Sequence, residues 1–478
     1  MLSLKYFWLL ALNACLFAGC KAQQKSASFQ NTKPVIAFPG AEGWGKYTSG
    51  GRDGIVYIVT NLNDNGPGSF RTGAGLNESA IIVFKVSGTI HLETPLKIKS
   101  NKTIAGQTAP GDGICIADRS VLIAGDNIIV RYLRFRMGDK YQRGGMVDGN
   151  GGDDAFGGTR RIHIIIDHCS MSWSTDEAFS VYAGDSTTLQ WNIISEPLNY
   201  SYHFEAGDSG YEHHGYGGIW GGRHFTAHHN LFAHCNNRNP RFDGIRNAPE
   251  ENVDYCNNVI YDWGENSIYA GEGGQYNIVN NYFKWGPSTI KKVKFRIVNP
   301  WMREKPFIPF GKYFVAENFV EGEDEITKNN SQGVFLGNNG TPADKEALLT
   351  AHPFAAEPVK MQSAEDAYKS VLKFSGASFK RDTLDERIIA DVINRKGSLI
   401  DVQGNYPHGT PYELTVNAWP YLISLPAPAD LDSDGIPDAW EKVKGLDPKN
   451  PADALQKTLD KQYTNIEVYI NSLLHTPQ

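Results

Sequence analysis

The sequence predicts an all-β fold: a parallel β-helix with flanking helices and a small C-terminal module. Short β-rich runs recur at a period of roughly 24 residues, and some intervals are longer by about a dozen residues. Several runs are followed by an asparagine and a second apolar run. The sequence lacks the regular hairpin turns that the alternative folds, an antiparallel sandwich or a propeller, need.

One marker residue in each run follows the register of the repeat. Successive markers lie about 25, 36, 24, 37, 28 and 24 residues apart, as expected where each coil adds a strand to a long sheet and insertions leave the stack as loops. The asparagines after the runs, such as Asn192, Asn258 and Asn281, are expected to stack as a ladder of side-chain amides. The markers are Ile104, Ile129, Ile165, Leu189, Thr226, Asp254 and Ile278.

Two coils are longer than the rest, over residues 137–161 and 196–223. Loops that leave a rigid scaffold often carry functional groups, so both are candidate positions for a site. Their titratable residues include Asp148, Asp153 and Asp154 in the first loop, and His203, Asp208, His213 and His214 in the second.

After Pro287 the repeat is expected to fade. Residues 364–374 and 383–394 have the pattern of amphipathic helices, the second with a capping box that begins at Thr383. We therefore expect a β-helix domain over residues 35–340, a helical and extended segment packed on it over 341–425, and a C-terminal module over 426–478.

The first twenty residues have the pattern of an export signal, followed by a polar linker over residues 21–34. The apolar run that ends before Cys20 is too short to span a membrane, and no other stretch is apolar enough. Small residues before Cys20 match a bacterial lipoprotein box, in which that cysteine is lipidated. The expected location is the outer membrane, facing the periplasm or the cell surface, with secretion as the alternative.

The net charge of −7 and pI near 6.0 provide no basic field for nucleic acid. An acidic substrate would have to be bound locally, by a few arginines or by metal ions.

The four cysteines beyond the leader lack the spacing of a zinc site, and most lie in apolar runs, so buried thiols are expected, with a disulfide between coils as the alternative. The chain is expected to be a monomer.

A twelve-residue acidic stretch near the C-terminus matches an EF-hand calcium loop. It has oxygen ligands at positions 1, 3, 5, 9 and 12, a backbone carbonyl at 7 and glycine at 6, and a helix is expected to follow, ending at Gly445. A single loop of this kind is more often structural than a calcium sensor. The predicted ligands are Asp430, Asp432, Asp434, Ile436 through its carbonyl, Asp438 and Glu441.

Arginines and acidic pairs in different coils suggest a second site. In a stack of coils they can face each other, an arrangement that suits an acidic polymer with a cation bridging it to the protein. The groups are Arg238 and Arg241 on one side, and Asp153, Asp154, Asp176 and Glu177 on the other.

Several stretches between about residues 35 and 287 resemble the pectate lyases of polysaccharide lyase family 1, which are right-handed parallel β-helices. The resemblance implies a calcium-dependent lyase that cleaves polygalacturonate, or pectin, by β-elimination to 4,5-unsaturated oligogalacturonides. The matching stretches are AFPGAEGWG at 37–45, GGR at 50–52, VTNLND at 59–64, IAGQTAPG at 104–111, Asp167-His168 and Arg238-Asn239-Pro240.

The resemblance assigns roles to individual residues. Arg238 becomes the catalytic base, or a cation that stabilises charge while hydroxide removes the proton. Asp154 and Asp176 become calcium ligands. The third ligand would fall near Ser180, which has no carboxylate, so Glu177 or Asp153 is expected to replace it.

Two substrate-binding positions depart from the family pattern. The second family arginine is replaced by Asp243, so Arg241 is the nearest group for a uronate carboxylate. The family lysine is missing, and His213 or His214 is expected in its place. Asp167 and His168 are expected to be a scaffold pair rather than catalysts.

Three other functions remain possible from the sequence alone. A non-catalytic galacturonan-binding β-helix would keep the groove without the chemistry. A calcium-independent pectin lyase would need fewer carboxylates than this chain has. Glycoside hydrolysis would need carboxylates placed as acid and base, and it ranks last.

Overall fold

The computed structural model describes residues 34–142, 153–204, 210–337 and 340–474. The chain divides into Met1–Pro34 and a compact unit over Val35–Gln478. The export signal and Cys20 lie outside the described residues, as do Asp148 and Asp208. Among the described helices, none has both the length and the apolar character of a membrane span.

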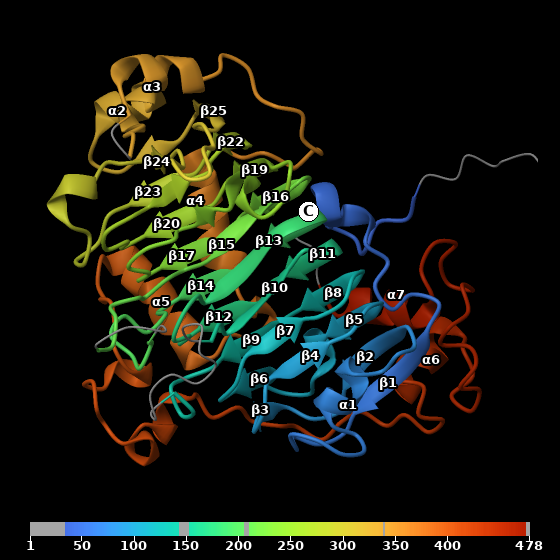
Figure 1. Ribbon diagram of the computed structural model, residues 1–478. Helices are drawn as coiled ribbons and strands as arrows, with labels where there is room; N and C mark the ends of the chain where they lie inside the picture. The colour runs from blue at the N-terminus through green and yellow to red at the C-terminus, as the bar shows by residue number, and fades with distance from the viewer. Residues whose placement is uncertain (1–33, 143–152, 205–209, 338–339, 475–478) are drawn as a thin grey trace, which may run out of the picture. The chain divides into compact units, whose positions relative to one another are not determined.

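Parallel strands stack along one axis, as Figure 1 shows, and connect into three long faces. The named strands of the described chain pair in parallel, for example Ile55 with Ala80 and Ile164 with Ile128. The first face consists of β1 (Ile55–Val59), β2 (Ala80–Phe84), β5 (Lys102–Ala105), β8 (Ile128–Arg131), β11 (Ile162–Asp167), β13 (Phe179–Gln190), β16 (Phe225–His228), β19 (Asn252–Cys256), β22 (Gln275–Val279) and β25 (Lys312–Ala316).

The other two faces complete each coil, and the long β13 runs from the third face into the first. The second face consists of β3 (Gly88–His91), β6 (Ile114–Ala117), β9 (Leu133–Arg136), β12 (Ser170–Ser172), β14 (Ile193–Ser195), β17 (Leu231–Ala233), β20 (Val259–Tyr261), β23 (Tyr282–Lys284) and β26 (Phe319–Val320). The third consists of β4 (Leu96–Ile98), β7 (Val121–Ile123), β10 (Phe156–Thr159), β13, β15 (Ile219–Gly222), β18 (Arg241–Phe242), β21 (Ile268–Ala270) and β24 (Val298–Pro300). The predicted right-handed parallel β-helix is confirmed.

The predicted register is correct for four markers and one residue off for the others. Ile129 pairs with Ile165, and Thr226 pairs with Asp254, as predicted. Thr226 also pairs with Thr188 rather than with Leu189, so Leu189 belongs to the next column, and the same offset applies to Ile104 and Ile278. Successive side chains of a strand point to opposite faces, so a one-residue offset exchanges the core with the outer face.

The outer threonines have partners of their own. The hydroxyl of Thr188 accepts the N–H of Gly45 at 2.8 Å, and the hydroxyl of Thr226 accepts the N–H of Trp44 at 3.1 Å. A polar column on the first face therefore holds the N-terminal 3-10 turn Trp44–Tyr47.

Apolar side chains fill the interior of the coils. Phe135 stacks on Phe156 with ring centroids 4.0 Å apart, and Phe156 stacks on Phe179 at 5.4 Å. All three rings are buried, and dispersion contacts between such stacked rings stabilise the column. The four cysteines of the described chain are free and buried, as predicted.

A ladder of asparagine side chains runs up one turn of the stack, as predicted. The Oδ1 atom of Asn258 accepts from the backbone N–H and the side-chain amide of Asn230, both at 2.9 Å. Asn281 makes the same pair of bonds to Asn258, and Asn318 continues the ladder. Every step satisfies buried polar groups that the turn would otherwise leave unpaired.

The coils continue beyond Pro287, which corrects the expectation that the repeat fades there. β24 pairs with β21, β25 pairs with β22 and β26 pairs with β23, completing a further turn. Insertions between these strands lengthen the coil, so the period is lost from the sequence while the pairing is kept.

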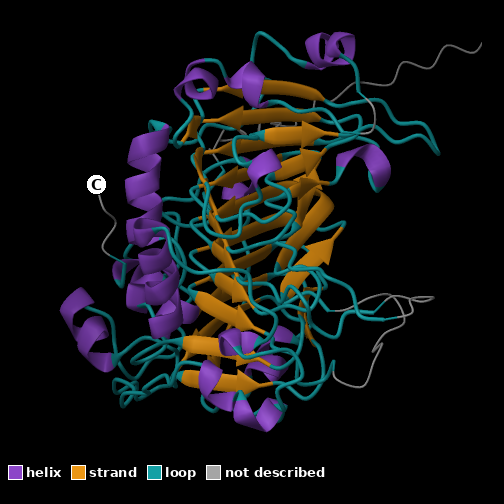
Figure 2. Cartoon of the chain, turned by 90° about the vertical axis from the view of Figure 1, so that its left-hand side faces the viewer, coloured by secondary structure: helices purple, strands orange, loops and turns teal. Residues whose placement is uncertain are grey.

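Two helices lie against the outside of the second face, along one flank of the strands in Figure 2. They are α4 (Ala364–Phe374) and α5 (Thr383–Asn394), and their bounds match the prediction. The N-cap of α5 is Asp382, not Thr383: its side chain accepts the N–H of Asp385. Buried Arg136 bonds both acids, with Nη1 at 2.6 Å from Asp382, so the cap also attaches the helix to β9.

The remaining helices are short. They are α1 (Phe70–Ala74), α2 (Asp324–Lys328), α3 (Pro342–Leu348), α6 (Asp438–Lys444) and α7 (Asn465–Ser472). As predicted, the helix after the acidic loop ends at Gly445, whose φ is 76°.

Candidate functional site

The candidate site lies where the chain enters successive strands of the third face. Asp154 precedes β10, Asp176 and Glu177 precede β13, Tyr216 precedes β15, and Arg238 precedes β18. These four strands stack in parallel register, so the residues before them meet along one edge. Backbone bridges continue the register outside the strands, from Glu177 to Tyr216 and from Tyr216 to Asn237.

The guanidinium of Arg238 points into this edge. Its Nη1 contacts the Oε1 of Glu177, and its carbon lies 4.1 Å from the ring centroid of Tyr216. The backbone of Arg238 has φ of 58°, a left-handed conformation that recurs at other turns of this chain, such as Trp191 and Asn257. The predicted meeting of this arginine with the acidic residues is what the structure shows.

Three carboxylates converge beside Arg238. Oxygens of Asp154, Asp176 and Glu177 lie within 4.8 Å of one another, and Asp154 Oδ1 accepts the N–H of Glu177 at 3.2 Å. Burial, and then the neighbouring Asp176, raise the pKa of Asp154 well above its usual value. Such crowding of negative charge favours a cation between the oxygens.

Two stacked histidines support Asp176. The rings of His203 and His214 are 3.5 Å apart, and His214 Nε2 lies 3.3 Å from Asp176 Oδ1. The Nδ1 atoms of both rings lie 3.4 Å from Glu212 Oε2. Burial alone would raise the pKa of Asp176, but the neighbouring His203 and His214 hold it below its usual value.

His213 and His214, predicted together, take different places. His214 is buried against Asp176, whereas His213 is exposed, with its ring 4.4 Å from that of Tyr200. His214 therefore contacts the acidic cluster and His213 does not.

Asp153 and Ser180 lie beside the cluster but outside it. Asp153 Oδ2 accepts from the side-chain amide of Gln142 at 2.6 Å. The hydroxyl of Ser180 accepts the N–H of Ile219 at 3.0 Å. Of the two replacements considered for the third ligand, the structure brings Glu177, not Asp153, to the other carboxylates.

Arg241 has partners within the protein. Its side chain is buried, with Nη2 at 2.9 Å from Glu272 and Nη1 at 2.7 Å from the carbonyl of Phe242. From the sequence, Arg241 is expected to bind a substrate carboxylate. In the structure its guanidinium instead bonds Glu272 and so joins β18 to the following coil.

Asp167 and His168 are joined within the scaffold. Asp167 is fully buried, accepting from Arg131 Nε at 2.7 Å and lying 2.7 Å from His168 Nδ1. Burial would raise the pKa of Asp167, but His168 and Arg131 hold it low. Neither residue belongs to the acidic cluster beside Arg238.

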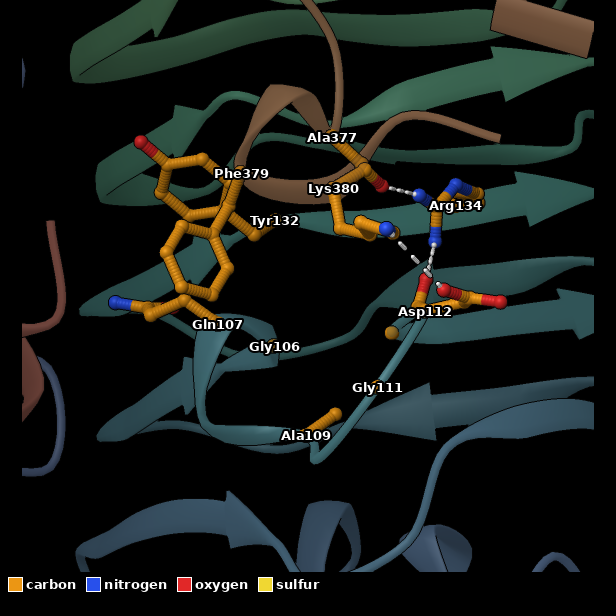
Figure 3. Close-up of a pocket in the computed structure, with 11 residues that line it drawn as sticks. Gly106, Gln107, Ala109, Gly111, Asp112, Tyr132, Arg134, Ala377, Phe379 and Lys380 are labelled. Carbon is orange, nitrogen blue, oxygen red and sulfur yellow. Dashed lines mark hydrogen bonds and ion pairs between the residues drawn. The ribbon is translucent and has the colours of Figure 1, made fainter. Parts of the chain in front are cut away.

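A small pocket in Figure 3 shares no residue with this site. There Arg134 donates to the carbonyls of Asp112 and Lys380, and Lys380 Nζ lies 3.9 Å from Asp112 Oδ1. The charged groups bind one another and fix the 377–380 segment to the coils, so this pocket is structural.

The C-terminal loop brings most of its predicted ligands together. Oxygens of Asp430, Asp432 and Asp434 lie within 4.8 Å of one another. Asp434 also forms such a group with Glu441 and with Asp453, a residue beyond the predicted loop. Asp438 is in neither group, and its Oδ1 accepts the N–H of Leu431 at 2.8 Å. The side chain of Ile436, whose backbone carbonyl is the predicted ligand, is fully buried.

Known proteins similar to this chain decide its family. A "Probable pectate lyase C" of Aspergillus flavus is 34% identical over 461 residues, covering 93% of this chain and 95% of the relative. A protein of the same name from Neosartorya fischeri is 36% identical over 462 residues, covering 94% and 96%. The chain belongs to the pectate lyase family. The predicted enzyme class, a polysaccharide lyase of the pectate lyase type, is confirmed.

Other comparisons add less. No protein-family profile matches the chain. A pectate lyase mutant of Bacillus subtilis has a TM-score of 0.48 at 15% identity, covering 73% of this chain and 99% of its own. The cedar pollen allergen Jun a 1 has a TM-score of 0.47 at 17% identity, covering 70% and 92%. The coils of this chain are defined by its own strand pairing.

Within this pectate lyase family member, sequence reasoning gave no role to three residues of the site. Tyr216, His203 and Glu212 all lie in the second lengthened coil. The length of that coil was the available signal, but its fold decides which of its aromatic and acidic side chains turn toward Asp176 and Arg238.

Proposed function

We propose that this protein is a calcium-dependent pectate lyase that cleaves polygalacturonate by β-elimination. One observation carries the proposal: the Arg238 guanidinium lies against a cluster of three carboxylates, Asp154, Asp176 and Glu177, on the outside of the β-helix. The names of the curated relatives support the substrate class.

The donor set fits calcium. Carboxylate oxygens are the ligands this hard cation prefers, and a cation would offset the burial and the repulsion from Asp176 that together raise the pKa of Asp154. When bound, calcium would supply Lewis-acid neutralisation of the uronate carboxylate, which makes the adjacent C5 proton easier to remove. Asp154, Asp176 and Glu177 are the residues that would hold it.

In the proposed reaction, the C5 proton leaves to a base, the C4–C5 double bond forms, and the C4–O bond breaks. The electron pair of that bond passes to the glycosidic oxygen, which takes a proton from solvent. Arg238 acts at C5, either as the base or as a cation that stabilises the developing charge while hydroxide removes the proton. Tyr216 orients the guanidinium by stacking under it.

The experiment follows absorbance of the unsaturated product, with polygalacturonate at alkaline pH, in calcium and then in excess chelator. We expect activity in calcium, loss of activity on chelation, and a loss of about 100-fold or more in Arg238→Ala. Arg223→Ala, at an exposed arginine paired with Glu250, is the matched control for removing a surface charge. Signal that survives chelation would indicate a calcium-independent pectin lyase, and polymer binding without product would indicate a non-catalytic binding protein.

Arg238→Lys separates the two roles of the arginine. If Arg238 is the base, the rising limb of the pH–rate profile, where activity increases with pH, should move toward the ordinary pKa of lysine, about 10.4. If Arg238 stabilises charge, the limb should stay in place and the rate should fall.

We also propose that the chain is exported and anchored through a lipid on Cys20, with residues 35–340, 341–425 and 426–478 acting as one compact monomeric unit. Metabolic labelling with palmitate tests the anchor: label should enter the wild type and should be absent from Cys20→Ser.

A further inference from the structure

The acidic loop of the C-terminal module is joined by a carboxylate that the sequence motif does not include. Asp453 lies twelve residues after Glu441, yet its ligand oxygen is within 4.8 Å of those of Asp434 and Glu441. Because Asp434 belongs to both groups, oxygens from Asp430 and Asp432 complete one continuous cluster.

Buried oxygens without partners point into this cluster. Glu441 is fully buried, and neither of its carboxylate oxygens has a hydrogen-bond partner. Asp434 Oδ2 and Asp453 Oδ1 are also buried and unpartnered, on residues that are only 4% and 5% exposed. Native proteins rarely leave such groups unsatisfied, and desolvated carboxylates are costly without a cation.

The electrostatics agree with the geometry. Burial, followed by the neighbouring Asp432, Asp430 and Asp453, raises the pKa of Asp434 to about 7. Burial and the carboxylate of Asp434 raise the pKa of Glu441 to about 7.

In Asp434 and Asp453, the second carboxylate oxygen bonds the backbone of the C-terminal module. Asp453 Oδ2 accepts the N–H of Asp447 at 3.1 Å, and Asp434 Oδ1 accepts the N–H of Ile436 at 2.8 Å. Asp438 caps the start of the loop through Leu431, so its place in the motif is used for structure. In both Asp434 and Asp453 one oxygen is thus held by a backbone N–H, and the other is buried and without a partner.

The loop is docked on the first coils of the β-helix, and Figure 1 shows α6 and α7 beside β1 and β2. Ile436, between two ligand positions, is fully buried in an apolar cluster with Ile81 and Val83 of β2. A side chain on Gly435 would meet Val56 of β1 at 2.9 Å, so the loop backbone itself touches the sheet.

Ion pairs hold the module at two further points. Asp430 Oδ2 lies 2.8 Å from Lys85 Nζ, directly after β2. Glu467 of α7 lies 2.8 Å from Arg52 Nε, and both side chains are nearly buried. The apolar cluster and these pairs cover the outer face of the amino-terminal coils.

We propose that Asp430, Asp432, Asp434, Glu441 and Asp453 bind one calcium ion that holds the C-terminal module against the amino-terminal coils of the β-helix. Asp453, not Asp438, supplies the ligand from outside the loop. The ion is structural: it holds Ile436 on β2 and keeps the outer face of β1, β2 and β5 covered. This site is separate from the cluster beside Arg238 and does not rest on the proposed function.

The test uses the whole exported chain and measures calcium stoichiometry by titration calorimetry, with thermal unfolding and limited proteolysis as independent readouts. Asp453→Asn and Glu441→Gln are each expected to lose one calcium equivalent and the part of the calcium-induced rise in Tm that this ion provides. In the presence of calcium, the C-terminal tails of these two variants are expected to be cleaved as fast as the wild-type tail is cleaved in chelator. Asp438→Asn is the matched control and should keep the ion.

Asp453→Asn with wild-type stoichiometry and Tm shift would overturn the role of Asp453. An Asp438→Asn variant that loses the ion while Asp453→Asn keeps it would favour the sequence motif instead. If either variant fails to fold, limited proteolysis of the wild-type protein tests the proposal. Tail cleavage at the same rate in calcium and in chelator would refute it, and so would protection by magnesium as strong as protection by calcium. Glu177→Gln should leave the tail ion and its protection unchanged, so this test can fail independently of the lyase assignment.

Discussion

The carboxylate of Glu177 contacts the guanidinium of Arg238 across the intervening coil of Tyr216 on the third face. Glu177 is also within 4.8 Å of two further acids through its ligand oxygen. Glu177 thus joins the two halves of the candidate site: its carboxylate belongs to the acidic cluster and also sets the position of the arginine, whose guanidinium neutralises part of that cluster.

Glu177 is therefore expected to be a calcium ligand, in preference to Asp153. In Glu177→Gln, the calcium concentration for half-maximal activity should rise at least about tenfold, since one charged ligand is lost. Asp153→Asn is the comparison, because that carboxylate is bonded to Gln142 and lies outside the cluster. Calcium titrations of initial rate measure both. An equal rise in Asp153→Asn would place that residue among the ligands after all.

His214 and His213 are expected to affect different quantities. His214→Gln removes a group that holds Asp176 in place, so the half-maximal calcium concentration should rise. His213 is exposed beside Tyr200, so His213→Gln should change KM for the polymer, if anything, and leave the calcium requirement as it is. Steady-state kinetics over a grid of calcium and polymer concentrations separate the two effects. A calcium requirement that moves only in His213→Gln would contradict this assignment.

Asn258 is expected to be essential to the stability of the stack. In Asn258→Ala, the amide groups of Asn230 lose their acceptor inside the protein, at a cost on the order of 3 kcal/mol. Asn63→Ala, at an exposed turn, should change the free energy of unfolding by no more than about 0.5 kcal/mol. Urea denaturation of both variants provides the comparison, and similar values for the two would mean that the ladder adds little.

His234 should contribute stability that depends on pH. Its Nδ1 lies 2.7 Å from Asp262 and its Nε2 lies 3.7 Å from Asp391, and despite the burial of the ring these two carboxylates raise its pKa to about 9. The folded protein holds the proton more tightly than the unfolded chain, whose histidine has a pKa near 6.5. The stabilisation is therefore complete below about pH 6.5 and is lost as pH rises through about 9.

The measurement is the difference in unfolding free energy between the wild type and His234→Gln across this pH range. It should be largest near pH 6, on the order of 3 kcal/mol, and should shrink toward pH 9.5. His352→Gln, at an exposed histidine, serves as the control. A difference that grows with pH would have the wrong sign for a protonated, paired histidine.

The sequence alone determined the parallel β-helix, the asparagine ladder, the flanking helices and the acidic C-terminal loop. Each depends on local signals that repeat: the spacing of runs, asparagine at one turn, apolar residues at helical spacing. It also indicated that Arg238 would face acids from earlier coils, because stacking brings corresponding turns together.

Only the tertiary structure decided which neighbours complete each site. Glu177 rather than Asp153 reaches the cluster, Arg241 bonds Glu272, and Asp453 joins a loop that ends twelve residues before it. The reason is geometric. A one-residue offset on a strand turns a side chain to the other face, and coils of unequal length place residues at the same edge without any fixed spacing in sequence.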